Sequence, residues 1–468
     1  MPRAGQVKPD RDQRLTDHVA LGVLTATFPP GLIDEVLAAT GRVEQRSRLL
    51  PARLVVYYVL ALALFSGDSY EEVMRCLVEG LSWASGWAQA WDVPTKGAIA
   101  KARERLTAAP LVELFARGCR PLATPATPGA FYRGLRLTSI DGTVLDVADT
   151  PANDAEFGRP SSGRGDGKGA FPQVRVVGLG ECGTHAVTAV AVGACTTGEQ
   201  ALARKLLSAL GPGMLCLADR NFTGYPLFAA AAANSAQLLW RAKTGLRLPV
   251  LERYPDGSYR SELVAATDRR RAHPLTVRVI EYTIDDPGRP QAEQGHYRLV
   301  TTLLDPDQAP AGELGALYAQ RWEFENLLDE LKTHQRGPRV VLRSKTPAGV
   351  TQEVYGHLCT HYAIRALMHT AAAQDGTDSD RLSFTRALKA ARRSVRAGLG
   401  TAIAVLSKAL EEAKAEICRH LLPPRRLRAA PRVVKRKMSN YGVKRAEHHT
   451  WPQPTRNPNE AIHILAPP

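Results

Sequence analysis

Apolar residues in this chain recur first at helical spacing and then at strand spacing. Over residues 15–122 they return every three or four positions, and they include a long apolar run after Pro51, which predicts a block of helices. Residues 135–147 are strand-like, and at 171–179 and 184–192 apolar and polar positions alternate and valine is frequent, which predicts three strands. From Glu199 onward helical and strand-like stretches take turns. This order predicts an α/β domain with a mixed sheet, preceded by an all-α domain.

Changes in composition set the predicted boundaries. Residues 123–130 combine Pro125 and Pro128 with Gly and Ala, which is typical of a linker. Residues 244–296 hold short strand-like runs and turn signals, which predict a β-rich insertion in the sheet domain. The predicted division is a polar arm at 1–14, a helical domain at 15–122, an α/β domain at 131–340 with the insertion at 244–296, further helices at 341–420 and a basic tail at 421–468.

One predicted helix, at residues 318–332, holds an unusual set of polar side chains. At about 100° per residue, Tyr318, Arg321, Glu325 and Lys332 fall within an arc of roughly 60° along the edge of an apolar face. A carboxylate between a guanidinium and an ammonium is suited to hold a divalent cation together with a phosphate. Spacing alone leaves a second interpretation open, which is a surface helix with solvated charges.

Two further acids come at the ends of apolar, strand-like stretches. Asp141 follows an apolar strand and precedes a glycine, and Asp219 follows the short apolar strand at residues 213–218. Taken alone, both are better explained as turn residues at strand ends. Cleavage of a phosphodiester needs an in-line nucleophile and neutralised charge on the attacking and leaving oxygens, and two Mg²⁺ ions on carboxylate ligands provide that neutralisation.

Three segments together resemble the insertion-sequence-four family of DDE transposases. The residues Tyr318, Arg321, Glu325 and Lys332 match all four positions of the YREK signature of that family. SIDGT at residues 139–143 is similar to its first catalytic block, and LADRNF at residues 217–222 is similar to its second. The resemblance extends from about residue 15 to the basic C-terminal segment. It implies a ribonuclease-H-like catalytic domain and an N-terminal helical domain that binds the ends of the mobile element.

The resemblance also implies roles for individual residues. The catalytic and metal-binding residues are then Asp141, Asp219 and Glu325, and the residues that contact DNA are Tyr318, Arg321, Lys332, Arg241, Lys243 and Tyr297. Mg²⁺ is the expected cofactor, with Mn²⁺ as a substitute. The positions of Arg241 and Lys243 also suit an exposed strand end. Hairpin-forming relatives stack an extruded base on an aromatic ring, often Trp, and the nearest match here is Tyr297, for which a tyrosine packed in the core is the alternative.

The activity implied is cleavage at insertion-sequence ends followed by strand transfer. Water attacks the phosphodiester at the element end, and the freed 3′-hydroxyl attacks either the opposite strand, giving a hairpin, or target DNA. The expected partners are double-stranded DNA, as terminal inverted repeats and as target, and a second copy of the chain in a homodimer. Two alternatives stay open: a nuclease of the same fold without strand transfer, and a non-catalytic DNA-binding descendant of a transposase.

The charge balance favours a polyanionic partner. The chain has 61 Lys and Arg against 46 Asp and Glu, a net charge of +15, and nucleic acid is the first candidate for such a protein. Residues 425–445 contain nine cations and no acid, which is typical of a tail that binds phosphates. Further cations suit DNA contact or a solvated surface: the loop at 158–169, the four at Lys96, Lys101, Arg103 and Arg105, and the helical row Arg386, Lys389, Arg393 and Arg396.

Cysteine usage and hydropathy set the expected compartment. The seven cysteines form no CxxC pair and leave one unpaired, so we expect reduced thiols. The first 14 residues lack the apolar core of a signal peptide, and the most apolar run, residues 54–65, is too short to span a bilayer. These features predict a cytoplasmic protein and no membrane partner, and the resemblance implies that it is bacterial and associated with the nucleoid.

Overall fold

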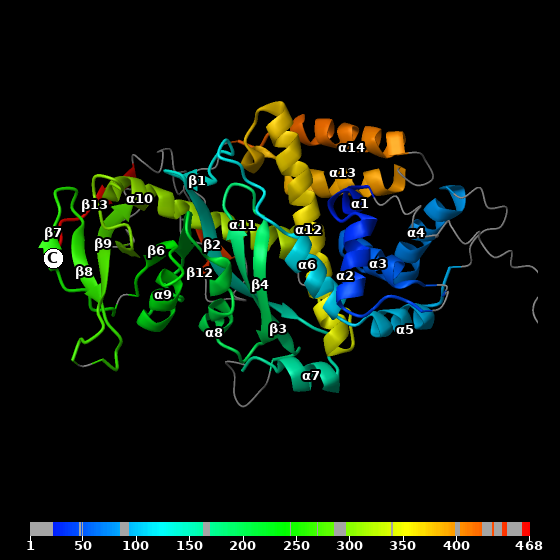
Figure 1. Ribbon diagram of the computed structural model, residues 1–468, viewed down its shortest axis with the longest axis horizontal. Helices are drawn as coiled ribbons and strands as arrows, with labels where there is room; N and C mark the ends of the chain where they lie inside the picture. Colours follow the sequence, from blue (N-terminus) through cyan, green and yellow to red (C-terminus); the bar gives the residue numbers. More distant parts are fainter. Residues whose placement is uncertain are drawn as a thin grey trace, which may run out of the picture. The chain divides into compact units, whose positions relative to one another are not determined.

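The computed structural model describes residues 22–45, 48, 50–84, 93–161, 169–243, 245–268, 270–284, 296–337, 340–397, 403–423, 433–434, 442–446 and 461–468. The chain forms two compact units (Figure 1). The helical unit contains Met1–Pro128, Gly142–Gly198 and Glu325–Leu422, and the sheet unit contains Gly129–Asp141, Glu199–Phe324 and Pro423–Pro468. The predicted arm, most of the loop at 158–169 and most of the basic tail lie outside the described residues.

The helical unit begins with a series of short helices. They are α1 (Val23–Thr27), α2 (Pro30–Ala39), α3 (Ala52–Leu64), α4 (Tyr70–Ala84), α5 (Lys96–Leu106) and α6 (Ala109–Gly118). Pro30 is the first residue of α2, where its missing N–H costs no hydrogen bond. Ser69 accepts a hydrogen bond from the amide of Glu72 at 3.1 Å and thereby caps α4. The helical pattern predicted for this part of the chain is confirmed in these described helices.

The core of the helical unit is built on α3 and the long helix α12 (Pro347–Asp375). Every residue of α3 from Leu54 to Leu64 is buried. Gly356 lets the backbone of α12 approach closely, because a Cβ there would lie 2.9 Å from Cγ1 of Val59 and 3.2 Å from its carbonyl oxygen. Thr360 Oγ1 donates to the carbonyl oxygen of Leu60 at 3.0 Å. The apolar run that was too short for a membrane span is therefore a buried helix.

Other elements complete this unit. They are α7 (Pro151–Phe157), β3 (Gln173–Glu181), β4 (Val187–Ala194), the 3₁₀ turn η6 (Ser379–Arg381), α13 (Phe384–Ala397) and α14 (Ile403–Cys418). β3 and β4 pair antiparallel, with Val176 opposite Val192, as the alternating pattern predicts. β2 (Leu135–Asp146) starts in the sheet unit, and its residues from Gly142 onward belong to the helical unit.

The sheet unit has parallel strands in its first part. β5 (Met214–Ala218) pairs parallel with β2 on one side and with β6 (Gln237–Arg241) on the other. Short helices join them: α8 (Glu199–Arg204), the 3₁₀ turn η2 (Leu207–Ala209) and α9 (Tyr225–Ala232). The helical stretch that begins at Glu199 is therefore interrupted after Arg204. The mixed α/β sheet is confirmed.

Strands of the predicted insertion extend the same sheet. β10 (His296–Thr301) pairs antiparallel with β6 and with β9 (Leu275–Ile284), and β8 (Tyr259–Leu263) and β7 (Glu252–Arg253) follow in the sheet order β6-β10-β9-β8-β7. Smaller strands are β1 (Phe131–Tyr132), β11 (Val433–Val434), β12 (Gly442–Val443) and β13 (Ile462–Ile464). The buried guanidinium of Arg278 pairs with Asp256, whose carboxylate also accepts from the amide of Ala311 at 2.9 Å. This contact ties the strands to the start of α10 (Ala311–Leu317).

The segment that carries the four-residue signature is not one uniform helix. It consists of the 3₁₀ turn η4 (Tyr318–Arg321), the α-helix α11 (Trp322–Asp329) and the π-helical turn η5 (Glu330–Gln335). The single arc computed at one angle per residue is therefore wrong, because 3₁₀ and π turns advance by different angles from an α-helix. Among the helices that the structure describes, none is long and apolar enough to cross a membrane.

Candidate active site

Asp141 and Asp219 lie side by side in the sheet unit. Ile140 on β2 is the register partner of Ala218 on β5, and the two strands are parallel, so the next residue on each is an aspartate. Leu137, Ile140 and the apolar residues of β5 are buried and fix both strands in the core. Asp219 directly follows β5, and its Oδ1 accepts a hydrogen bond from the amide of Asn221 at 2.5 Å. Both aspartates are partly exposed, so their oxygens are accessible to a ligand.

The first two residues of the four-residue signature lie beside this pair. Arg321 is buried, and its Nη1 is 3.5 Å from Oδ2 of Asp141. Tyr318 is also buried, and its hydroxyl donates to the carbonyl oxygen of Ala218 at 3.2 Å, one residue before Asp219. Burial raises the pKa of Tyr318, so the hydroxyl stays protonated and keeps donating. The sheet unit thus gathers two carboxylates at neighbouring strand positions, with a guanidinium and a phenol from η4 beside them.

Three more predicted DNA-contacting residues lie on β6, β10 and the turn after β6. The guanidinium carbon of Arg241 is 4.2 Å from the ring centroid of Tyr297, which is a close cation–π contact. Tyr297 stacks on the buried ring of Tyr282, with centroids 5.0 Å apart and planes 13° apart. The guanidinium of Arg241 therefore covers one face of the Tyr297 ring. A base could stack directly on that face only if the guanidinium moved away, and otherwise it would stack on the guanidinium. Lys243 is exposed.

Glu325 and Lys332 belong to the helical unit. Glu325 is partly exposed on α11. Lys332 is on the π turn, and its Nζ donates to Oγ1 of Thr143 at 2.8 Å, two residues beyond Asp141 on β2. Burial and the neighbouring Arg336 guanidinium lower the pKa of Lys332, whereas Asp146 and Asp329 oppose that shift. The structure thus places one half of the signature in each unit.

Not every predicted cation is available to DNA. Arg103 is buried, and its guanidinium donates to Oε1 of Gln352 at 3.1 Å and to Oγ of Ser344 at 3.0 Å. The suggestion that it contacts phosphate is wrong, because it joins α5 to α12 inside the helical unit. Lys96, Lys101 and Arg105 are exposed, as are Arg386, Lys389 and Arg393 on one face of α13. The side chain of Arg396 lies outside the described residues.

Comparison with known proteins decides the family. The model of the N-terminal region of insertion element 4 transposases matches residues 18–116, and the model of the transposase DDE domain matches residues 132–362. Transposase InsG for insertion sequence element IS4 of Escherichia coli (strain K12) is 28% identical over 420 residues, 88% of this chain and 91% of that protein. The chain belongs to the insertion-sequence-four family of DDE transposases. The resemblance seen in the three sequence blocks is confirmed.

Two further relatives are more distant. The putative transposase InsZ of Escherichia coli (strain K12) is 22% identical over 222 residues, 47% of this chain and 71% of that protein. A cryo-EM structure of the piggyBac transposase synaptic complex with hairpin DNA covers 89% of this chain and 87% of its own, at 11% identity and a TM-score of 0.41. A score of this size does not establish a common fold. The matched DDE domain of this transposase-family chain includes Asp141, Asp219 and Glu325.

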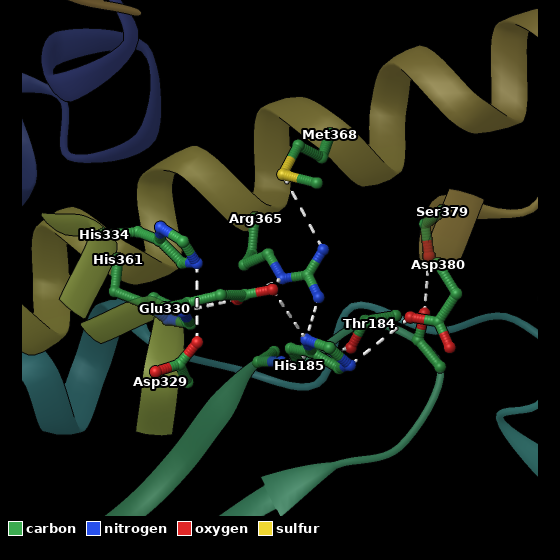
Figure 2. A network of polar contacts seen from close by, with 12 residues as sticks. Thr184, His185, Asp329, Glu330, His334, His361, Arg365, Met368, Ser379 and Asp380 are labelled. Atoms are coloured by element: carbon green, nitrogen blue, oxygen red, sulfur yellow. Dashed lines mark hydrogen bonds and ion pairs between the residues drawn. The ribbon is translucent and has the colours of Figure 1, made fainter. Parts of the chain in front are cut away.

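Sequence reasoning missed two features of this family member. The first is the contact between Thr143 and Lys332. Thr143 belongs to the first catalytic block, but no sequence pattern indicates this contact. A buried polar network around Glu330 was also missed (Figure 2). The signal for it was present, because His357, His361 and Arg365 follow one another at intervals of four on α12 and therefore share one helix face.

Proposed function

We propose that this chain is a DNA transposase that cleaves DNA at the ends of its insertion sequence and transfers the freed strand into target DNA. The observation that carries the proposal is the juxtaposition of Asp141 and Asp219 on neighbouring parallel strands, with the Arg321 guanidinium 3.5 Å from Asp141. Glu325 supplies the third carboxylate in this proposal. It is the acid of the signature and follows Arg321 by four residues.

Divalent cations fit the donor set of this site. Mg²⁺ and Mn²⁺ are hard ions that take carboxylate oxygens, and Asp141 and Asp219 present such oxygens from adjacent, partly exposed positions. We assign Asp141, Asp219 and Glu325 as the residues that hold them. When bound, two cations neutralise charge on the attacking and leaving oxygens of the phosphodiester.

The remaining residues of the signature bind the strand being processed. Arg321 is held between protein groups, because its guanidinium carbon is 5.9 Å from the centroid of the Tyr318 ring and 5.1 Å from a ring centroid of Trp322. A guanidinium fixed in this way is suited to orient a phosphate through its forked donors. Lys332 contributes a charged donor, and Tyr318 contributes a neutral donor once its hydroxyl releases the carbonyl oxygen of Ala218. Arg241, Lys243 and Tyr297 extend the contact along the strand.

Several finer features are part of the same proposal. Parallel strands β2, β5 and β6 beside an antiparallel β3–β4 pair suit a ribonuclease-H-like domain within residues 131–340, with the insertion at 244–296. The helical domain at 15–122 binds the element ends, and the helices at 341–420 and the basic tail at 421–468 follow it. The chain acts as a homodimer on paired terminal inverted repeats, and cut-and-paste movement proceeds through hairpin ends.

Strand cleavage and joining by the Glu325→Ala variant test this proposal. Wild type and variant are incubated with Mn²⁺ and a labelled duplex that carries the element's own end. We expect wild type to cut and join while Glu325→Ala only binds, because a missing carboxylate removes a cation ligand. Glu412→Gln is the control, since its exposed side chain on α14 pairs only at 3.9 Å with Lys408 in the described contacts, and it should match wild type.

The other outcomes identify the alternatives. If wild type and variant both bind without cutting, the chain is a DNA-binding descendant of a transposase. If both cut equally, Glu325 is not a catalytic ligand. Cutting without joining by wild type would identify a nuclease of the same fold. A hairpin at the element end that has been cut from its flanking DNA would indicate the hairpin route. Joining without such a hairpin would indicate direct transfer of the cut strand.

A further inference from the structure

The helical segment that carries Glu325 and Lys332 changes its winding between these two residues. α11 ends at Asp329, and Glu330–Gln335 is wound as a π-helix with i→i+5 hydrogen bonding. Such turns are rare in proteins, and those that occur often lie at functional sites. Because the backbone does not prefer this winding, other contacts must stabilise it. Lys332 lies within the turn, so those contacts also determine where its ammonium is placed.

Glu330, the first residue of the π turn, is anchored by buried groups (Figure 2). Its Oε2 is 3.1 Å from Nε2 of His361 and 3.2 Å from Nε of Arg365. Its Oε1 is 3.2 Å from Nδ1 of His185. His361 and His185 are fully buried at the side chain, and Arg365 is 1% exposed. A carboxylate in such a place is held strongly, because its charge is matched by the guanidinium and water is excluded.

The anchor continues through His185 to a second acid. Nε2 of His185 lies 3.3 Å from Oδ1 of Asp380, which belongs to the 3₁₀ turn η6. In the same turn, Ser379 Oγ donates to the carbonyl oxygen of Gly183 at 2.5 Å. His185 itself has a φ of +57°, a conformation that is uncommon for a residue other than glycine. The surroundings of Glu330 are therefore fixed on both sides.

The far end of the π turn is tied to the same helix. Gln335 Nε2 donates to the carbonyl oxygen of His357 at 3.0 Å, and the carbonyl oxygen of Gln335 accepts from Ser66 Oγ at 2.5 Å. His357, His361 and Arg365 are spaced four residues apart on α12. The first and last residues of the turn thus rest on one face of one long, buried helix.

Lys332 lies between these two attachments. Its ammonium donates to Thr143 at 2.8 Å and is partly buried. Arg336, on the following turn, is buried as well. Two cations on adjacent turns repel each other, and the fixed ends of the segment oppose this repulsion. Conversion of the π turn to an α turn would change the direction in which Lys332 leaves the helix.

We infer that Glu330 is a positioning residue of this transposase: its carboxylate, anchored on His361 and Arg365, fixes the π turn that delivers Lys332 to Thr143 and to the bound DNA strand. The effect on DNA rests on the proposed function, because that function assigns Lys332 to the strand being processed. The anchoring itself does not depend on that function and has a test of its own.

Hydrogen exchange of the full chain tests the anchor. In Glu330→Gln, amides of residues 330–336 should exchange faster by at least about tenfold, because the local opening of the turn becomes easier. Glu412→Gln, which makes the same chemical change at an exposed position of α14, should exchange like wild type. Unchanged exchange at residues 330–336 in Glu330→Gln would overturn the inference.

A double-mutant cycle tests whether Glu330 acts through Lys332. Single-turnover cleavage of the labelled end duplex in Mn²⁺ is measured for wild type, Glu330→Gln, Lys332→Ala and the double variant. We expect Glu330→Gln to lower the rate by about 10- to 100-fold with unchanged affinity for the duplex, since misplacement by an ångström has effects of this size. The double variant should cut no more slowly than Lys332→Ala. Multiplied losses would show that Glu330 has a purely structural role and would contradict the inference.

A second variant covers the case in which Glu330→Gln does not fold. Thr143→Val keeps the shape of the side chain and removes the acceptor of Lys332, without touching the Glu330 network. It should lower the cleavage rate in the wild-type background and have no effect in Lys332→Ala, whereas a rate equal to wild type would contradict the placement of Lys332. A wild-type chain that cuts no DNA would overturn the proposed function, and exchange at residues 330–336 would still decide the anchor.

Discussion

Two carboxylate–arginine pairs in this chain have opposite surroundings. In the sheet unit, Asp141 is 20% exposed at the side chain, lies 3.5 Å from Arg321 and has Asp219 beside it on the next strand. In the helical unit, the side chain of Glu330 is 10% exposed and has Arg365, His361 and His185 within 3.2 Å. The first pair leaves two acids next to each other near solvent. The second is enclosed by its own partners.

The difference shows how the chain separates binding from support. Like charges on adjacent strands repel, so a cation bound in the proposed way would stabilise Asp141 and Asp219 in addition to the Arg321 guanidinium. Glu330 has its countercharge within the fold, and a cation there would compete with Arg365. The partly exposed pair therefore fits the proposed cation site, and the enclosed carboxylate fits a supporting role in the fold.

The largest effect is expected at the exposed pair. Asp219→Asn removes one charge from the proposed cation ligands while it keeps an oxygen for the amide of Asn221. Mutation of a residue that hydrogen-bonds to a metal ligand typically lowers activity by about 10- to 100-fold. Mutation of a ligand itself should therefore lower the cleavage rate by more than about 100-fold. The measurement is the single-turnover rate on the end duplex as Mn²⁺ is raised.

Asp305→Asn is the matched control for this comparison. Asp305 lies four residues after the end of β10 and also accepts a hydrogen bond from an amide two residues on, that of Asp307, at 2.9 Å. It shares the local turn chemistry of Asp219 without a neighbouring acid at a matched strand position. It should cut at the rate of wild type. Equal losses in both variants would indicate that the turn, and not the cation, is what Asp219 provides.

The second effect, at the enclosed pair, is on stability. Arg365→Met leaves Glu330 buried without its guanidinium and should lower the free energy of unfolding of the helical unit by about 3–5 kcal/mol. Arg117→Met breaks an exposed pair with Glu113, at 38% and 34% exposure, and should cost only about 0.3–0.5 kcal/mol. Urea denaturation compares the two. A similar small loss in both would mean that the Glu330 network is solvated.

The sequence predicts the exposed site better than the enclosed one. Asp141, Asp219 and Arg321 each carry a local signal: an acid after an apolar strand, or a place in the four-residue signature. The parallel β2–β5 pairing that brings the two aspartates together follows from the alternation of strands and helices. The helix content of the first hundred residues and of α12 follows from apolar spacing.

The enclosed network is not predictable in the same way because it depends on contacts distant in sequence. Glu330 meets residues 31 and 145 positions away, His361 and His185 respectively. The winding of residues 318–335 is equally hidden, because a π turn is stabilised by these tertiary contacts and not by local propensity. For the same reason Arg103 has the sequence of a surface cation but is buried against α12.

The smallest effect concerns the charge on Lys332. This residue lies on the same segment of the chain, residues 318–335, as Arg321 and Glu330, the two residues that the comparison sets apart. Burial and the neighbouring Arg336 lower the pKa of Lys332 from its usual value of 10.5. Between the lowered pKa and 10.5 the unfolded chain binds more protons, so the contribution of Lys332 to stability rises with pH in that window. Cleavage should change in the opposite direction, because the ammonium that binds the phosphate is lost as pH rises through the lowered pKa.

Lys332→Arg separates these two consequences. Since a guanidinium stays protonated throughout the alkaline range, the variant should lose the alkaline fall in the cleavage rate, while its rate at neutral pH drops by about tenfold or less because the bulkier group fits Thr143 less well. The profile is recorded from about pH 7 to pH 10 at constant ionic strength and Mn²⁺. Binding of the end duplex is measured in parallel, so that a general loss of affinity is not mistaken for titration. An alkaline fall of the same midpoint in both proteins would assign it to another group and remove Lys332 from the bound strand.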